Sequence, residues 1–379
     1  MKKITQSRKE LIGFLDFFKK IPDHRVDRQK LHSVEEILLV AFCAIIAGCE
    51  GWADIELFGK TRIDFFRTFL PFPNGIPSDD TFRRFFRVLD PKVFESHFLE
   101  WIKSLQLNLE SKVVAIDGKT DRRSFDGDQY PLHLLSAYAT EIGLVLGQEK
   151  VADKSNEITA IPKLLDVLDV SGAIVTIDAI GCQLSIANKI IDKKANYLLA
   201  LKGNQARLYD DVKLFFEERP SKFEFPSYEE VDNAHGRIET RRCTVNNSIG
   251  WLNERYPEWR NMQSIVEIEA TRKIKNETTT EKRYYISSLK EEPAKILTAV
   301  RQHWGIENQL HWVLDVCFGS DQSRIRKGNA PHNVAVIRRS TFNLLKQIKK
   351  DYPRISIKQL RKLAGWDNNF LSKVLFLKI

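Results

Sequence analysis

The spacing of apolar residues changes near residue 110 of this 379-residue chain. Before that point, apolar residues recur every three or four positions, which is the spacing of one face of an α-helix. Residues that begin helices stand where this spacing needs them: Ser33 precedes two glutamates and a long apolar run, Ser78 or Asp79 precedes a segment rich in Phe and Arg, and Asp90 precedes a proline. These signals predict a small helical domain at the start of the chain.

From Val113 the pattern shifts to short apolar, β-branched runs separated by turns. Three strands are expected in succession, and helices and strands alternate after them. The strands are expected near residues 113–117, 131–140, 143–151, 173–178 and 196–202, and the helices at 157–168, with Ser155 and Asn156 as caps, at 182–194, and after Asn204 as far as Phe216. This order predicts an α/β fold with a ribonuclease H-like catalytic core, in which the first and fourth strands end at one edge.

Residues 219–290 interrupt this order with alternating segments separated by Asn, Gly and Pro, and they predict a β-rich insertion. A long helical stretch resumes at Pro293. The expected divisions are a helical, DNA-binding N-terminal domain (1–110), the first part of the core (111–218), the insertion (219–290), the final part of the core (291–345) and a basic C-terminal segment (346–379).

The distribution of charge along the chain indicates a polyanionic partner. The net charge is +9, and the residues from Gln322 onward hold fourteen Lys or Arg against two Asp, so the whole excess lies in the C-terminal part. A polyanion such as double-stranded DNA is the predicted partner, although a solvated basic helix face would give the same count.

Several classes of protein are disfavoured. The five cysteines form no CxxC pair and show neither zinc nor disulfide spacing. The amphipathic, charged segment at 11–20 does not suit a signal peptide. The longest apolar run, Ile37–Gly48, is shorter than the roughly 20 residues that span a bilayer, so it predicts a buried helix. A cytoplasmic protein with no membrane partner is expected.

Two of the predicted strands end in a carboxylate. Asp117 closes VVAID and is followed by Gly-Lys, and Asp178 closes AIVTID. A lone buried charge is costly unless something pairs with it. A metal ion is therefore the candidate partner of both aspartates.

The third carboxylate is expected in HWGIENQLHW, where Glu307 lies on the flank of a helix beside its core stripe. His303 and His311 stand four residues before and after it. A zinc site at this spacing is the weaker interpretation, because no HExxH is present and both aspartates would be left without a role. On the helix alone, a surface glutamate is the favoured interpretation. The core stripe consists of Ile306, Leu310, Val313 and Cys317.

Three carboxylates suit Mg²⁺, which prefers oxygen ligands, with Mn²⁺ as a substitute. In phosphoryl transfer, two such ions about 3.5–4 Å apart activate the attacking oxygen and stabilise the leaving one. Asp117, Asp178 and Glu307 are therefore candidate catalytic residues and metal ligands of an enzyme that cuts or joins phosphodiester bonds. Strand-end aspartates also occur in hydrolases and nucleotide enzymes, and spacing alone leaves those classes open.

Basic, amide and aromatic side chains near these positions are candidates for DNA contact, with a solvated or salt-bridged surface as the alternative for the charged ones. Trp304 and Trp312 could stack on an unpaired base, but core packing is the favoured interpretation of both. The DNA-contact candidates are Lys119, Arg122, Arg123, Lys202, Asn204, Arg237, Arg241, Arg301, His303, Trp304, His311 and Arg324.

Longer segments resemble a known family. AIDGKT, KSNEITAIPKLLDVLDVSG, IVTIDAIGCQ, YLLALKGNQ, HGRIETRRC and RQHWGIENQLHWVLDVCF resemble the DDE transposases of bacterial insertion sequences, in particular the branch that includes the H-repeat-associated proteins. IPDHR, GCEGWADIELFG and GIPSDDTFRRFFRVLDP resemble the associated N-terminal domain of that branch. The resemblance covers about residues 15–345. It implies a ribonuclease H-like core with a β-strand insertion, and it puts the two aspartates and the glutamate of the family at Asp117, Asp178 and Glu307.

The implied activity is Mg²⁺-dependent cleavage at the ends of an element, followed by attack of the freed 3′-hydroxyl on target DNA. At least a homodimer is expected in the DNA complex, because two ends must be held together. Two other hypotheses remain open: a nuclease of the same fold that cuts without joining, and a protein descended from a transposase that binds element ends without chemistry.

The sequence departs from the family at a few positions. Val300, His303 and Leu314 stand at the offsets around Glu307 where the broader family has Tyr, Arg and Lys. A small residue would be expected near Arg123, and an acidic pair in place of Ser320-Asp321. Each departure favours a weakened copy.

Overall fold

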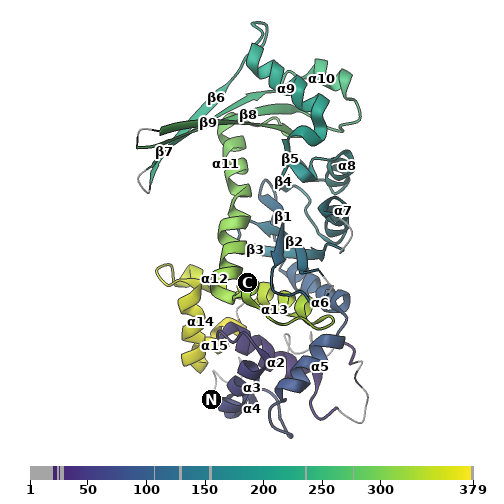
Figure 1. Ribbon diagram of the computed structural model, residues 1–379, viewed down its shortest axis with the longest axis vertical. Helices are drawn as coiled ribbons and strands as arrows, with labels where there is room; N and C mark the ends of the chain where they lie inside the picture. Colours follow the sequence, from purple (N-terminus) through teal and green to yellow (C-terminus); the bar gives the residue numbers. More distant parts are fainter. Residues whose placement is uncertain are drawn as a thin grey trace.

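The computed structural model describes residues 20–23, 25, 30–105, 107–127, 130–152, 156–234, 237–275 and 277–376. Within them the molecule is elongated, with helices gathered at one end, long strands toward the other, and the centre of a sheet between them (Figure 1). Nearly all of the predicted amphipathic segment at 11–20, and the predicted cap Ser155, lie outside the described residues.

A nine-stranded mixed sheet runs through the molecule in the order β3-β2-β1-β4-β5-β9-β8-β7-β6. The neighbours β1, β4 and β5 are parallel, and the other neighbouring pairs are antiparallel. The strand β1 continues past the point where β4 stops. The strands are β1 (Val113–Asp121), β2 (Leu132–Ala139), β3 (Leu144–Lys150), β4 (Ile174–Ile177), β5 (Asn196–Leu201), β6 (Ser227–Ala234), β7 (Arg237–Asn246), β8 (Ser264–Ile274) and β9 (Glu277–Ser287).

Helices cover both faces of the sheet centre. The helices α7 (Glu157–Val167) and α8 (Leu184–Asp192) lie on one face and α11 (Pro293–His303) on the other (Figure 1). The strands β1 to β5 and the helices α7, α8 and α9 (Ala206–Glu218) follow the predicted order of three strands and then alternating helices and strands. That prediction is confirmed. Each face of the sheet is therefore shielded by an apolar helix surface, as parallel strands require.

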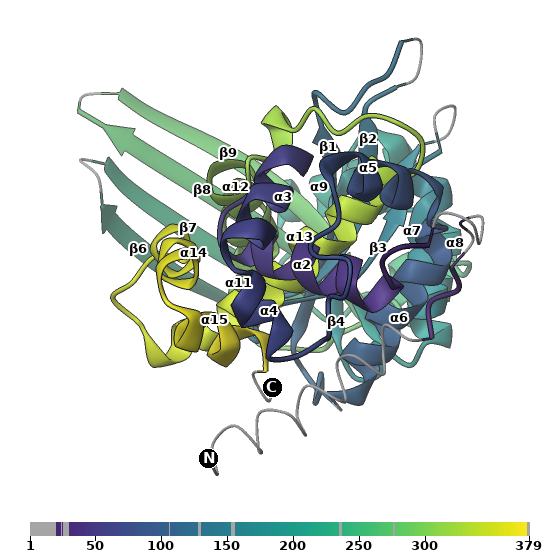
Figure 2. The ribbon, with the colours of Figure 1, turned by 90° about the horizontal axis from the view of Figure 1, so that it is seen from below.

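The strands predicted for residues 219–290 are present as β6 to β9, with α10 (Gly250–Arg255) between β7 and β8. They extend the central sheet, because β9 pairs with β5. The helix α11 packs on β6 and β7 as well as on β1 and β4. Figure 2 shows the far ends of these strands projecting to one side of the molecule.

In the described part of the chain, the helical end contains α2 (Val34–Ile46), α3 (Trp52–Thr61), α4 (Ile63–Arg67), α5 (Asp79–Val88) and α6 (Pro91–Ser104). The predicted caps are confirmed, since Ser33, Ser78 and Asp90 each accept a hydrogen bond from the first turn of α2, α5 and α6. The helix α2 is buried on all sides, because three C-terminal helices pack against it. These are α13 (Ala330–Ile348), α14 (Ile357–Trp366) and α15 (Asn368–Leu375).

The C-terminal basic charge is not all on the surface, so the charge count overstated what is available to a polyanion. Arg338, Arg339 and Arg361 are buried. The Arg361 guanidinium donates to the carbonyl oxygens of Ile45 and Cys317 and lies 4.2 Å from the centre of the Phe318 ring. Arg361 thereby links α14 to α2, and Arg339 donates to the Ser136 hydroxyl oxygen of β2.

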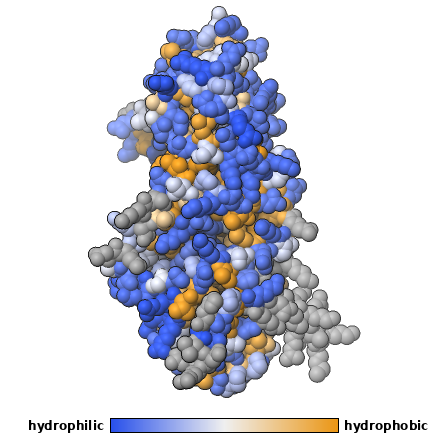
Figure 3. Space-filling view, turned by 90° about the vertical axis from the view of Figure 1, so that its right-hand side faces the viewer, coloured by the Kyte–Doolittle hydropathy of each residue, from blue (hydrophilic) through white to orange (hydrophobic). Residues whose placement is uncertain are grey.

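The face of the molecule seen in Figure 3 is mostly hydrophilic, with small hydrophobic groups scattered over it. This is the ordinary appearance of a protein surface that faces water. Among the described residues, the structure has no helix long and apolar enough to cross a bilayer.

Candidate active site

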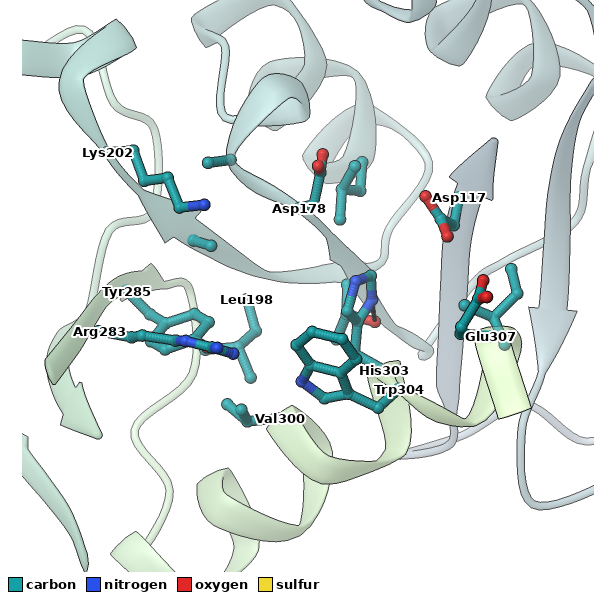
Figure 4. A pocket seen from close by; sticks show the side chains of 15 residues that line it. Asp117, Asp178, Leu198, Lys202, Arg283, Tyr285, Val300, His303, Trp304 and Glu307 are labelled. Atoms are coloured by element: carbon teal, nitrogen blue, oxygen red, sulfur yellow. Dashed lines mark hydrogen bonds between the residues drawn. The ribbon is translucent and has the colours of Figure 1, made fainter. Parts of the chain in front are cut away.

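A cleft of about 310 Å³ opens at the edge of the sheet where β4 stops. Ile116 of β1 pairs with Ile177 of β4, so the residues that follow them, Asp117 and Asp178, stand at the same level of two parallel strands. Both carboxylates line the cleft (Figure 4). After Asp178 the chain turns into a short 3₁₀-helix, and the Ile180 amide donates to Asp178 Oδ1 at 3.1 Å.

The third carboxylate reaches the cleft from the α11 side of the sheet. After α11, Glu307–His311 form a turn of π-helix that continues into α12 (Trp312–Phe318). His311 Nδ1 is 2.9 Å from Glu307 Oε2 and 3.7 Å from Asp117 Oδ2. One ligand atom from each of these three residues lies within 4.8 Å of the other two. Turns of π-helix are rare and are found frequently at functional sites.

Negative charge is concentrated around Asp117. Burial, with the charges of Glu157, Asp178 and Glu307 next to it, raises the pKa of Asp117 to about 7, while a hydrogen bond from the Gly118 amide opposes the rise. Carboxylates crowded in this way repel one another, and a divalent cation between them would remove the repulsion.

His311 is placed to orient Glu307. It is 3% exposed, and burial lowers its pKa to about 4, so the ring is neutral at ordinary pH. A carboxylate only accepts hydrogen bonds, so Nδ1 of His311 donates to Glu307. Within the described part of the chain, the buried Nε2 of the ring has no hydrogen-bond partner. The carboxylate oxygens, supported by this imidazole, form a donor set that fits a divalent metal ion.

Three of the predicted DNA-contact residues, Lys202, His303 and Trp304, line the same cleft. His303 Nδ1 lies 3.0 Å from the Thr176 hydroxyl oxygen. Trp304 is 49% exposed and Trp312 is 57% exposed, so the interpretation of both as core residues was wrong. Of the core stripe beside them, Ile306, Leu310 and Val313 are buried and Cys317 is half-buried, whereas the two indoles are exposed.

Two further candidates make contacts within the protein. Lys119 is buried, and its Nζ lies 2.6 Å from Asp315 and 3.1 Å from Asp321, so it forms an internal ion pair and does not present its charge to DNA. Asn204 donates to the carbonyl oxygens of Ala179 and Cys182, and it thereby holds the turn that follows Asp178.

The remaining candidates lie outside the cleft lining. Arg237 and Arg241 share the carboxylate of Glu239, and Arg301 pairs with Glu230 at 2.5 Å, as in a salt-bridged surface. The other three, Arg122, Arg123 and Arg324, are exposed.

Sequence reasoning missed two charged residues near the cleft. Arg283 of β9 lines the cleft, and its guanidinium lies 5.2 Å from the centre of the Trp304 ring. Its strand was predicted, but nothing in the sequence shows that β9 pairs with β5. Glu157, whose charge acts on Asp117, was treated only as the start of a helix.

Comparison with known proteins agrees with this geometry. The family model described as "Transposase DDE domain" matches residues 108–344, and the model described as "DDE_Tnp_1-associated" matches residues 15–102. The chain therefore belongs to the DDE transposases of insertion sequences.

The relatives of the chain show which branch of the family it belongs to. The chain is 40% identical to "Putative transposase YncI" of Escherichia coli O157:H7 over 96% of its own length and 94% of the relative. It is 39% identical to "H repeat-associated putative transposase YhhI" of Escherichia coli K12 over 97% of its length and 98% of the relative. A shorter relative from the same strain, "Inactive transposase YbfQ", is 43% identical over 20% of this chain and 89% of its own length. The resemblance to the H-repeat-associated branch is confirmed.

Protonation of His303 is expected to destabilise the fold. Burial lowers its pKa below the ordinary 6.5. As pH falls through that value, the unfolded chain takes up a proton that the folded chain does not, and stability is lost at no more than about 1.4 kcal/mol per pH unit. Urea denaturation in EDTA at about pH 7.5 and about pH 5.5 should therefore show a smaller loss for His303→Asn than for wild type. Equal losses in the two proteins would contradict this expectation.

Proposed function

We propose that this protein is an active DNA transposase with a ribonuclease H-like core, which cuts phosphodiester bonds at the ends of its element and joins the 3′-hydroxyl to target DNA. One observation carries the proposal: Asp117, Asp178 and Glu307, from β1, the end of β4 and the π-helical turn, line a single cleft. Family membership supports the same reaction class.

Asp117, Asp178 and Glu307 would hold the metal, which we take to be two Mg²⁺ ions, with Mn²⁺ as a substitute. When bound, such ions activate the attacking oxygen and stabilise the leaving oxygen of a phosphodiester. Other side chains of the protein position these carboxylates. His311 orients the Glu307 carboxylate, and Asn204 fixes the turn that carries Asp178. Holding these groups in place before the substrate arrives lowers the cost of reaching the reactive geometry.

The other side of the cleft is suited to the DNA strand. Lys202 and Arg283 bring positive charge beside Asp178, and Trp304 presents an exposed ring (Figure 4). Lysine and arginine bind phosphates, and an exposed indole stacks on bases. The partners are double-stranded DNA, as element ends and as target, and a second copy of the chain.

Lys202→Gln is expected to weaken the binding of DNA ends, since one phosphate contact is lost. The slope of the logarithm of the binding constant against the logarithm of the salt concentration should become shallower by about one. Gel-shift titrations at several salt concentrations measure both quantities. The matched control is Lys222→Gln, an exposed lysine that lies over the Phe223 ring and is not part of the cleft lining. An unchanged slope for Lys202→Gln, or an equal change in the control, would remove Lys202 from the DNA path.

The decisive experiment uses a labelled duplex carrying the terminal repeats of the element, incubated with wild-type protein in Mg²⁺ or in EDTA. Metal-dependent 3′-hydroxyl ends and strand-transfer products are expected. Cleavage without joining would replace the transposase proposal by that of a nuclease. Binding without cleavage would favour a protein that holds element ends without chemistry, with Arg123 and Ser320 as the first departures to revert.

A further inference from the structure

A further carboxylate lies against β1 next to the candidate active site. Glu157 is the first residue of α7, and its side chain is 21% exposed. A Cβ atom added at Gly118 would lie 2.0 Å from Glu157 Oε1 and 2.7 Å from His133 Nε2. A side chain at position 118 would require the Glu157 carboxylate to move away from β1, because the carboxylate occupies the space that a Cβ atom would need.

This carboxylate approaches β1 from the side opposite to Glu307. Successive side chains of a strand point to opposite faces of the sheet, so the position above Gly118 lies across the strand from the Asp117 side chain. Glu157 comes from α7 on one face, whereas Glu307 follows α11 on the other. The helix α7 also packs against the 3₁₀-turn after Asp178. Asp117, in the middle of β1, therefore has one glutamate on the α7 face of the sheet and one on the α11 face.

A hydrogen-bonded chain fixes the orientation of Glu157. His133 of β2 pairs with Thr120 of β1, and its Nδ1 lies 2.7 Å from the Thr120 hydroxyl oxygen. Its Nε2 lies 2.7 Å from Glu157 Oε1. With the hydroxyl donating to Nδ1, Nε2–H donates to the carboxylate. Among the described residues, the hydrogen-bond donors reach only Oε1 of Glu157, and none of them donates to Oε2.

The hydrogen bond between His133 and Glu157 resembles the one made by Glu307. There too a histidine, His311, donates to one carboxylate oxygen beside Asp117. Carboxylates that bind metals are commonly held by such a second hydrogen bond. The charge of Glu157 also acts on Asp117, as those of Asp178 and Glu307 do.

We propose that Glu157 is a fourth carboxylate of the metal centre, oriented by His133. Glu157 binds one cation from the α7 face, Glu307 binds the other from the α11 face, and Asp117 between them is available to both. This assignment rests on the proposed function, since it presupposes a centre formed by Asp117, Asp178 and Glu307.

Mn²⁺ binding to the metal-free full-length protein tests the assignment without relying on activity. Calorimetry and the electron paramagnetic resonance signal of free Mn²⁺ report the number of sites and their affinity. Glu157→Gln should lose one site or weaken it by at least about tenfold. Gly118→Ala should do the same although all four carboxylates remain, because the added methyl group displaces the Glu157 carboxylate. The matched control is Asp166→Asn, which removes an exposed carboxylate from the same helix. Thermal denaturation in EDTA checks that each variant is folded.

The outcomes separate this inference from the proposed function. Mn²⁺ binding that Asp178→Asn and Glu307→Gln weaken, but Glu157→Gln and Gly118→Ala leave unchanged, would overturn the role of Glu157 and leave the proposed function standing. An equal loss in Asp166→Asn would also overturn it, because the effect would then be one of general charge. A wild-type protein that neither binds Mn²⁺ nor cuts DNA would overturn both.

Discussion

Replacing Asp178 by asparagine, or Glu307 by glutamine, is expected to lower the rate of Mg²⁺-dependent cleavage of element ends by about a thousandfold or more. Each substitution keeps the shape of the side chain and removes the negative charge that holds a hard cation. Single-turnover cleavage of a labelled duplex, followed on a denaturing gel, measures the rate.

The fold and DNA binding should survive both substitutions. Glu307 is exposed, and Asp178 is held through its backbone turn and by Asn204 beneath it. The matched control is Glu291→Gln, which removes a partly exposed carboxylate that pairs with Lys295 just before α11. A variant of Asp178 or Glu307 that cuts within about tenfold of the wild-type rate would show that the carboxylate is not part of the reacting centre.

Arg361→Ala is expected to lower the free energy of unfolding by about 3 kcal/mol. The substitution leaves the carbonyl oxygens of Ile45 and Cys317 without their buried donor, and it removes the guanidinium that lies over the Phe318 ring. Urea denaturation followed by circular dichroism measures the loss.

The control for Arg361 is its exposed neighbour, Lys362→Ala, which removes the same charge from the same helix. Its stability should stay within about 0.5 kcal/mol of wild type. Equal losses of stability in the two variants would show that the buried hydrogen bonds of Arg361 do not help to hold the C-terminal helices to α2.

Local patterns predicted the strands and the cleft residues that the strands carry. Asp117 and Asp178 each close an apolar run, and the parallel pairing of β1 with β4 then puts both at one edge. The offset of Glu307 beside a largely buried core stripe made it a candidate, although the helix alone favoured a surface glutamate. The need for a third carboxylate and the family resemblance singled it out. Short-range periodicity places a strand or a helix flank, because such positions depend on few neighbours.

The errors concern side chains whose surroundings come from far along the chain. Lys119 follows Asp117 closely, but its pairing with Asp315 and Asp321 depends on residues about two hundred positions away. Arg361 adds to a charge count, but its site is made by α2 and α12. Arg283 reaches the cleft only because β9 pairs with β5. Composition and spacing carry no information about these long-range contacts.

The separation of the carboxylates along the chain also determines when each of them is made during translation. Glu307 is made about 130 residues after Asp178, and the helices that support its segment follow later still. At about 5–20 residues per second, the ribosome needs roughly 6–26 s to cover that interval. A growing polypeptide therefore holds two of the three carboxylates for many seconds without being able to assemble the cleft. The cleft for which we propose DNA cleavage can therefore form only after the segment around Glu307 has been synthesised.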